Sequence, residues 1–375
     1  MASSTDLWTI LIITSLAHSA FVVLFLFLKK EHQQTRGKWL LLLLLSLFWL
    51  QLEFLSVRWP YDVGLSLFYG TRHGSWLLVG PLFYYYLKSL IGKKVERHEY
   101  VYLIPFLLFT VLLPLFLQDF LSFRQVHYGM LTPFDRRPDA IDFWQYVYSG
   151  VFVGQFFYLF YFLLEGKSLI DKYRKSLKQY YSQLESGKVQ LLHILWFGML
   201  LILIMSTLFL FILFFTEIYR RHLDYLYVIP TSVLVYALSY RVFGVSLPAP
   251  ENAAKYQKSG LKKEDAALLK QQLGRVISDE KLFLRKGLKL NELAEKLEVS
   301  NHQLSEVLNQ HLQISFFDLI NQYRVEEAKK RIKEHPQYTL LQIAHDSGFN
   351  NKTSFVNAFK RFEGLTPSQY HKSLR

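Results

Sequence analysis

The chain has 375 residues, enough for two or three domains; 51% are apolar, 17% are aromatic, and the net charge is +13. The absence of cysteine excludes disulfides, thiol nucleophiles, cysteine-ligated zinc and thiol redox sensing. The apolar residues are concentrated before residue 244. This composition predicts a membrane-embedded first part and a soluble second part, whose basic charges suit membrane orientation and phosphate contacts respectively.

The first 243 residues contain seven apolar stretches that are candidates for crossing a bilayer. They comprise residues 7–28, 39–57, about 65–91, 100–117, 143–164, 191–215 and 223–243. No basic segment precedes the first stretch and no clear small-residue cleavage site follows it, so we interpret it as a retained span. We therefore predict a seven-transmembrane helix bundle for residues 1–243.

The basic residues between these stretches predict the orientation of the bundle. The connections after stretches one, three and five carry fourteen Lys and Arg residues, whereas those after two, four and six carry seven. Because the richer connections belong in the cytoplasm, we expect the N-terminus outside and the C-terminus inside. The predicted location is the inner (cytoplasmic) membrane, in multi-pass form, with the lipid bilayer as one partner.

Three connections have features of their own. Residues 165–190 are basic and helical in pattern; they extend the fifth span into the cytoplasm, lie on anionic lipid, or form an ordinary connector. Residues 118–142 are the largest external segment, either a ligand-binding loop or a plain connector. Residues 244–263 form a linker that prolines stiffen. An amphipathic helix at 264–277, with Leu269, Leu273 and Val276 on one face, packs on the following unit or pairs with another subunit as a homodimer.

Polar residues inside the predicted spans are candidates for binding an unidentified signal ligand. Ionisable groups at membrane depth are costly and are often functional. We single out His18, Gln51, Glu53 and Gln155, and take His18, Glu53 and Gln155 as the ligand-binding candidates. The alternative is structural: Glu53 pairs with Arg58 or reaches the outer interface, and His18 bonds a neighbouring helix.

The last part of the chain contains the same pattern twice. In each copy a short apolar helix leads through a tight turn into a second helix, which predicts two helix-turn-helix units. The inward positions of the first are Leu290, Leu293, Ala294, Leu297, Leu304, Val307 and Leu308. Those of the second are Leu340, Ile343, Ala344, Phe355, Phe359 and Phe362. Glu298 and Val299 form the first turn, Ser300 caps the helix after it, and Gly348 permits a second turn where a side chain would clash.

At these residues the chain resembles the DNA-binding domain of AraC-type bacterial transcription regulators. The segments that carry the resemblance are SFFDLINQYRVEEAKKRI and LLQIAHDSGFNNKTSFVNAFKRFEGLTPSQY. The resemblance implies a DNA-binding domain at residues 264–375, double-stranded DNA as partner, and a bacterial membrane. Two positions depart from the family pattern: Gln313, where glycine usually ends the first recognition helix, and Arg331, which is usually apolar. We expect that helix to end differently, so that the first unit binds less regularly.

A long helix at about 316–332 joins the two units. At 1.5 Å per residue it extends over about 25 Å, which would set two recognition helices into successive major-groove turns. We expect Arg324 to brace the two units rather than to touch DNA. The residues expected to pack inward are Phe316, Ile320, Tyr323, Ala328 and Ile332.

The exposed polar residues of the second helix in each unit are the candidate DNA contacts, because major-groove reading needs polar side chains on one helix face. In the first unit these are Asn301, His302, Gln303, Ser305 and Glu306. In the second unit the base-reading candidates are Asn351, Lys352, Ser354 and Asn357. Three others are expected to anchor phosphates: Thr353, Lys360 and Arg361. The alternative for each is a surface position that contacts nothing.

We therefore predict an all-α, membrane-embedded, sequence-specific transcription regulator that couples a signal sensed in the membrane or outside to promoter binding. The alternative is a transmembrane receptor or transporter whose cytoplasmic tail is a protein-interaction module. A retinal-binding sensor is disfavoured because residues 223–243 contain no lysine. No HExxH, GxSxG or Gly-rich phosphate-loop motif occurs, so we predict no enzyme, no cofactor and no metal site.

Overall fold

A computed structural model describes residues 7–28, 35–58, 72–112, 143–183, 186–215, 225–242 and 263–374. The predictions for residues 118–142 and 244–263 therefore lie outside the described residues. All regular elements in the described ranges are helices, as expected from the sequence. The chain divides into two compact units: Met1–Ile170 with Gln190–Ala249, and Asp171–Val189 with Pro250–Arg375.

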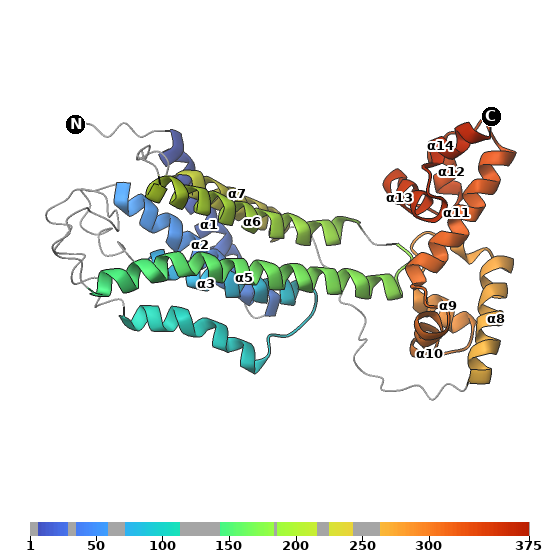
Figure 1. Ribbon diagram of the computed structural model, residues 1–375, viewed down its shortest axis with the longest axis horizontal. Helices are drawn as coiled ribbons and strands as arrows, with labels where there is room; N and C mark the ends of the chain where they lie inside the picture. The colour runs from blue at the N-terminus through green and yellow to red at the C-terminus, as the bar shows by residue number, and fades with distance from the viewer. Residues whose placement is uncertain are drawn as a thin grey trace. The chain divides into compact units, whose positions relative to one another are not determined.

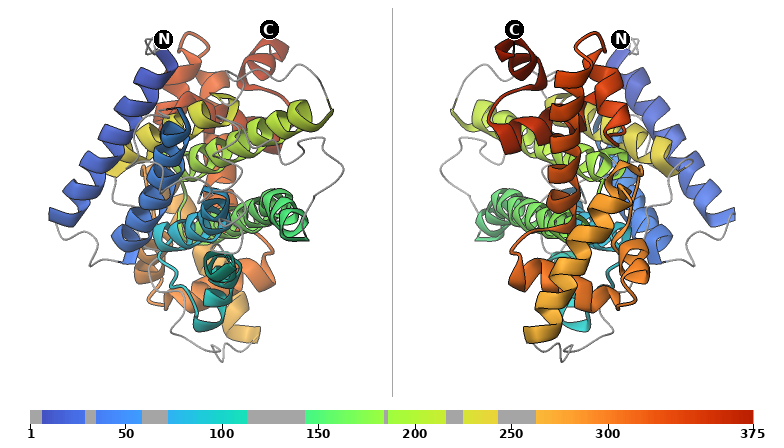
Figure 2. Two further views of the ribbon diagram at one scale, coloured as in Figure 1. Left: turned by 90° about the vertical axis from the view of Figure 1, so that its left-hand side faces the viewer. Right: turned by 90° about the vertical axis from the view of Figure 1, so that its right-hand side faces the viewer.

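The first unit is a bundle of helices (Figure 1). Their residue ranges overlap those of the predicted spans. Its elements are α1 (Leu7–Leu28), α2 (Thr35–Arg58), α3 (Arg72–Leu90), η3 (Arg97–Leu103) with a helix at 104–112, α7 (Tyr225–Val242), and most of α5 (Phe143–Tyr180) and α6 (Ser186–Phe215). Figure 2 (left) looks nearly along α5, which lies beside α3. The absence of a side chain on Gly80 allows this approach, since a Cβ there would meet the Phe162 ring at 2.9 Å.

Hydropathy and helix length select two segments of the described chain as able to cross a membrane, Thr9–Leu28 and Val189–Ile212. Two shorter apolar helical segments occur at Gly37–Leu52 and Val228–Leu238. The count of seven spans therefore stays a prediction.

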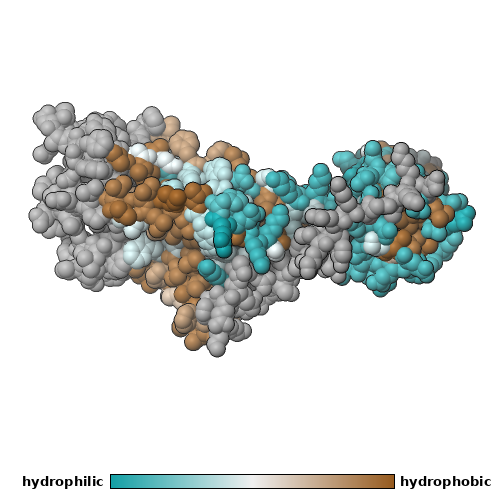
Figure 3. Space-filling model, turned by 90° about the horizontal axis from the view of Figure 1, so that it is seen from below, coloured by the Kyte–Doolittle hydropathy of each residue, from teal (hydrophilic) through white to brown (hydrophobic). Residues whose placement is uncertain are grey.

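The described part of this unit exposes many large apolar side chains, while its interior is also largely apolar and contains a few buried polar residues. Large apolar side chains of α6 are exposed along one stripe: Ile194, Phe197, Leu201, Ile204, Leu208 and Phe211. Figure 3 shows apolar side chains over much of the described surface of this unit. Inside, the amide of Gln51 donates to Ser15 Oγ and to Ser232 Oγ, both at 3.0 Å, and joins α1, α2 and α7.

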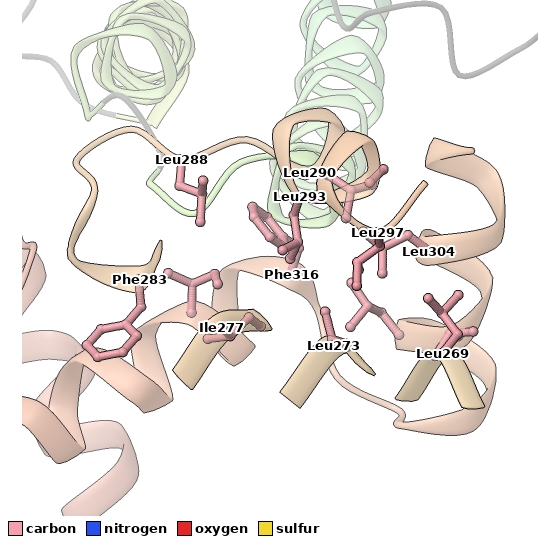
Figure 4. Packing of buried hydrophobic residues seen from close by; sticks show 14 of the residues in the cluster. Leu269, Leu273, Ile277, Phe283, Leu288, Leu290, Leu293, Leu297, Leu304 and Phe316 are labelled. Carbon is pink, nitrogen blue, oxygen red and sulfur yellow. The ribbon is translucent and has the colours of Figure 1, made fainter. Parts of the chain in front are cut away.

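The second unit contains the two helix-turn-helix motifs. Its helices are α8 (Lys263–Asp279), α9 (Leu290–Lys296), α10 (Asn301–Glu306), α11 (Phe316–Glu334), α12 (Leu340–Asp346), α13 (Lys352–Glu363) and α14 (Pro367–Ser373). The first core gathers side chains from α8, α9, α10 and α11 around Leu293 and Leu304 (Figure 4). Leu269, Leu273 and Ile277 of α8 are buried in this core, so α8 packs on the first motif (Figure 2, right). Val276, predicted on the apolar face, is partly buried.

The helix α11 contributes to both cores, as its sequence pattern predicts. Phe316 and Ile320 lie in the first core, whereas Ala328 and Ile332 lie in the second. Tyr323 stacks on Phe283 with ring centroids 5.8 Å apart. One rigid helix therefore ties the two motifs together.

The two turns repeat the same geometry with different residues. Val299 N donates to Ala294 O, and Phe349 N donates to Ala344 O, both at 3.0 Å. The residue before each donor has a left-handed backbone, with φ of 56° at Glu298 and 87° at Gly348. A Cβ at Gly348 would lie 2.6 Å from the Phe283 carbonyl oxygen. The predicted clash at the second turn is thereby confirmed.

The first recognition helix ends in a wider turn than the second. After α10 the backbone forms the π-helical turn η6 (Val307–His311), and Leu312 N donates to Val307 O at 3.0 Å. Gln313 then adopts φ of 50°, the left-handed conformation that glycine accepts without steric cost. Glutamine in place of the family's usual glycine at position 313 thus puts a side chain on a residue with left-handed backbone. The chain still changes direction there.

Three glycine substitutions separate the energetic cost of backbone strain from that of a steric clash. Gly348→Ala is expected to destabilise the second unit by more than about 2 kcal/mol, because strain and a clash coincide. Gly364→Ala has φ of 74° but open space around it, so strain alone should cost about 1 kcal/mol. Gly274→Ala, inside α8 with open space, should stabilise by about 0.5–1 kcal/mol. Hydrogen–deuterium exchange of residues 263–374 in the full chain measures the three effects, and equal effects would contradict the expectation.

Replacing the left-handed glutamine tests the end of the first recognition helix. Gln313→Gly is expected to raise the free energy of unfolding by about 1 kcal/mol, because glycine removes the left-handed penalty. Gln310→Gly, within the π turn, is the matched control and should lower it by about 1 kcal/mol. The same exchange measurement applies. A loss of stability in Gln313→Gly would show that the glutamine side chain contributes more than its backbone strain costs.

Candidate nucleic-acid interface

The start of each recognition helix is fixed by a side-chain cap. Ser300 Oγ accepts from Gln303 N at 3.2 Å, and Gln303 Oε1 accepts from Ser300 N at 2.9 Å. The expected cap at Ser300 is confirmed. The side-chain oxygen of Gln303 is therefore already hydrogen-bonded within the cap. Only its side-chain NH2 group remains free to donate to the edge of a base.

Asn351 performs the same task for α13. Its Oδ1 accepts from Ser354 N at 2.8 Å, so this residue is the N-cap of the second recognition helix. A paired contact to adenine needs both Oδ1 and Nδ2. Asn351 in this conformation offers only its Nδ2, whereas Asn357, six residues further along the same helix, is exposed. A base-reading role at either position remains a prediction.

The remaining candidates lie on accessible faces that cover the two cores. On α13, Lys352, Thr353, Asn357, Lys360 and Arg361 are exposed, while Phe355, Ala358 and Phe359 point into the second core. On α10, Asn301 is exposed, and His302, Ser305 and Glu306 are half-buried. Each helix thus presents polar groups outward from an apolar anchor, as a groove-reading helix requires.

The sequence analysis missed two polar residues on the π turn, Asn309 and Gln310, which are both exposed. Asn309 Nδ2 donates to the Ser305 carbonyl at 2.8 Å and contacts its Oγ at 3.1 Å. The spacing of Asn301, Ser305 and Asn309 at every fourth position was the available signal. The predicted contacts stopped at Glu306, although the helix was expected to continue toward Gln313.

Arg361 makes a structural contact as well as being a predicted phosphate anchor. Its guanidinium pairs with the Asp318 carboxylate at 2.8 Å and so joins α13 to the first turn of α11. Lys360 forms no ion pair within the described part of the chain. Because its charge has no protein partner there, Lys360 is the more suitable residue for an unperturbed phosphate contact.

Arg324 on α11 holds the two motifs together from the inside. Its side chain is fully buried; Nε donates to Phe283 O at 2.7 Å and Nη2 donates to Arg285 O at 3.0 Å. Its guanidinium also lies over the ring of Phe349 in the second motif, 5.8 Å from the centroid. Burial lowers the pKa of Arg324 to about 10, which leaves it charged at neutral pH. The predicted bracing role is confirmed.

Arg331, the other departure from the family pattern, also links helices. Its Nε pairs with Glu327 at 2.8 Å on the same helix, and its Nη1 lies 3.7 Å from the Asp346 carboxylate at the end of α12. A charged residue is accommodated there because two carboxylates face it. The contact positions α12 against α11, beneath the second recognition helix.

The membrane-depth candidates have different surroundings. His18 on α1 stacks on Tyr236 of α7 with ring centroids 4.7 Å apart, and Gln51 belongs to the serine-bonded cluster described above. Gln155 on α5 is fully buried, and neither atom of its amide has a hydrogen-bond partner in the described structure. The side chain of Glu53 lies outside the described residues, so its proximity to His18 stays a prediction.

Comparison with known proteins supports the assignment of the second unit. Residues 293–373 match a family model described as a helix-turn-helix domain. The chain is 31% identical over 88 residues to the HTH-type transcriptional regulator YtdP of Bacillus subtilis, covering 24% of this chain and 11% of that protein. It is 27% identical over 89 residues to the Msm operon regulatory protein of Streptococcus mutans, covering 24% and 32% respectively. The match thus spans less than a third of either relative.

A third relative, an HTH-type transcriptional regulator of Staphylococcus aureus, is 34% identical over 89 residues, which are 24% of this chain and 12% of that protein. No solved structure matches the chain. The similarity is confined to the segment that forms the two motifs. The C-terminal part of this chain therefore contains a helix-turn-helix domain of the AraC type, and relatives that match it there are named HTH-type transcriptional regulators.

Proposed function

We propose that the chain is a membrane-embedded transcription regulator that reads DNA through α10 and α13 and responds to a signal received by its first unit. The observation that carries this proposal is the pairing of a helix-turn-helix domain with a helical unit that exposes apolar side chains. The first feature implies double-stranded DNA as partner. The second is compatible with a lipid environment and unfavourable in water.

The exposed stripe on α6 supports the membrane assignment in physical terms. It runs from Ile194 to Phe211, which is about 26 Å at 1.5 Å per residue, close to the hydrocarbon thickness of about 30 Å. In water, a continuous surface of this kind would favour aggregation. In a bilayer it contacts acyl chains, and the serine–glutamine cluster at Gln51 remains satisfied inside the bundle.

The first unit also has features of a signal-receiving bundle. Three helices meet at Gln51 through hydrogen bonds to Ser15 and Ser232, and His18 stacks between α1 and α7 at a nearby level. Gln155 adds a buried amide that has no hydrogen-bond partner among the residues that the structure describes. A ligand that bonds such groups would favour one helix arrangement over another, which is the requirement for a two-state sensor.

The base-reading and phosphate-anchoring assignments are tested by paired variants. Asn351→Ser with Asn357→Ala should relax base preference, because it removes both amides while serine keeps the N-cap of α13. Lys360→Ala should weaken binding to all sequences and reduce the slope of log Kd against log salt by about 0.9. Binding of full-length protein to selected and random duplexes at several salt concentrations distinguishes the two effects.

A variant that removes only the N-cap of α13 is the control for this experiment. Asn351→Ala alone should cost about 1 kcal/mol of stability by removing the cap, so its DNA-binding defect mixes two causes. Equal losses on selected and random DNA for the double variant and for Lys360→Ala would reject the division between readers and anchors. Wild-type protein without affinity for any duplex at low salt would reject the proposed function.

Reporter fusions test the membrane topology. Green fluorescent protein fused after Leu374 should fluoresce in the membrane fraction, and alkaline phosphatase at the same point should be inactive, because the DNA-binding domain is expected in the cytoplasm. A phosphatase fusion replacing the chain after residue 130, in the external connection, is the matched control and should be active. The reverse pattern, or fluorescence in the soluble fraction, would contradict the proposed location.

A further inference from the structure

The helix α5 continues well beyond its apolar part. Its 38 residues extend over about 57 Å, whereas the hydrocarbon core of a bilayer is about 30 Å thick. From Glu165 onward the sequence is polar, with buried positions at Ile170, Tyr173 and Leu177 and exposed charges between them. The segment from Asp171 to Val189 belongs to the same compact unit as the DNA-binding domain. One continuous helix therefore begins in the bundle and ends in the DNA-binding unit.

The end of this helix is hydrogen-bonded to the first motif. Tyr181 forms an antiparallel bridge with Lys289, directly before α9. Ser182, which is fully buried, donates to the Leu288 carbonyl through its backbone N at 3.1 Å and through its Oγ at 2.6 Å. Tyr180 packs against the first core. These contacts add a short extra strand-like segment to the first motif.

The same segment also reaches the second motif. Gln183 Nε2 donates to the Gly348 carbonyl at 2.8 Å, at the turn that precedes the second recognition helix. Between these points, Arg324 Nη1 lies 3.4 Å from the Ser182 carbonyl, a weak bond beside the two stronger bonds of its guanidinium. Three consecutive residues thus contact the first motif, the connecting helix and the turn of the second motif.

A basic side chain one turn earlier adds to this docking. The Lys178 ammonium lies 5.4 Å from the Phe317 ring centroid, at the start of α11. Burial lowers the pKa of Lys178, Arg361 and Arg174 lower it further, and Asp318 opposes them. The end of α5 therefore lies close to the Asp318–Arg361 pair, which itself joins the connecting helix to the second recognition helix.

We infer that residues 178–183, at the end of α5, are the element through which the membrane-embedded unit sets the relative position of the two recognition helices. This inference rests on the proposed function. Because the segment bonds both motifs, a shift or rotation of α5 changes the two anchoring points together and alters the spacing between the recognition helices. Residues 178–183 are thus a regulatory contact surface, in addition to the linker at 244–263 that the sequence singled out.

The docking is tested first by cross-linking in the full chain. The chain has no native cysteine, so Tyr181→Cys with Lys289→Cys allows a single disulfide. Facing residues of an antiparallel pair have Cα atoms about 4.5–5.5 Å apart, which suits a disulfide. We expect rapid oxidation in native membranes, and none for Tyr181→Cys with Lys372→Cys on α14. An uncross-linked Tyr181–Lys289 pair would overturn the inference.

The effect on DNA reading is tested with Gln183→Ala, which removes the hydrogen bond to the Gly348 carbonyl. The control is Gln190→Ala, because Gln190 is an exposed residue of α6. The probe is a duplex selected from a random library by the full-length wild-type protein, and the same duplex with one base pair inserted between its half-sites. One base pair rotates the half-sites by about 34° relative to each other. We expect the insertion to weaken wild-type and Gln190→Ala binding about tenfold, and Gln183→Ala binding threefold or less.

The possible outcomes separate the two proposals. Selection of no duplex by the wild-type protein rejects the proposed function itself. Selection of a duplex, with an equal insertion penalty in all three proteins, leaves DNA reading intact and overturns the role of the α5 segment. A Gln183→Ala protein that binds the original duplex normally and tolerates the insertion supports the inference, because a merely unfolded variant would lose both duplexes.

Discussion

The buried guanidinium of Arg324 is the constraint on which the DNA-binding unit depends. A charge removed from water is costly unless its donors are satisfied, and a guanidinium has five of them. Here the two shorter bonds go to the carbonyls of Phe283 and Arg285, in the turn before the first motif, and two longer ones go to the Ser182 carbonyl and the Asn321 side chain. The charge is therefore satisfied only when the segment before the first motif has folded against α11, and the Phe349 ring of the second motif lies over the guanidinium.

This arrangement explains why neighbouring residues have little freedom. The turn at Gly348 passes so close to Phe283 and to the Arg324 Nε that a Cβ would lie within 3.0 Å of either. The ring of Phe349 covers the guanidinium, and the second core begins directly behind it. At the outer ends, the pairs of Arg361 with Asp318 and of Arg331 with Asp346 fix α13 and α12 to α11. Both helices of the second motif are thus attached to the connecting helix α11 by ion pairs.

Much of this unit follows from local sequence patterns. Apolar spacing predicted the helices from α8 to α13 and most residues of the two cores, and the turn chemistry predicted the roles of Ser300 and Gly348. It did not predict α14 or the core positions Ile277, Phe283, Leu288 and Val325. The caps show where such reasoning stops: an asparagine at the start of a helix suits both base reading and capping, and only the structure reveals the bond from Ser354 N to Asn351. The docking of residues 181–183 had no local signal, because its partners are more than a hundred residues away in the chain.

Helix α5 has two different surfaces along its length. Its first part exposes Val153, Phe157 and Phe160, side chains that lipid solvates well and water does not. Its last turns carry Lys172, Arg174 and Lys175 on the outside and end in hydrogen bonds to the DNA-binding unit. A helix is stiff along its axis because each turn is bonded to the next. The last turns of α5 are thereby held at Leu288, before the first motif, and at Gly348, in the turn of the second.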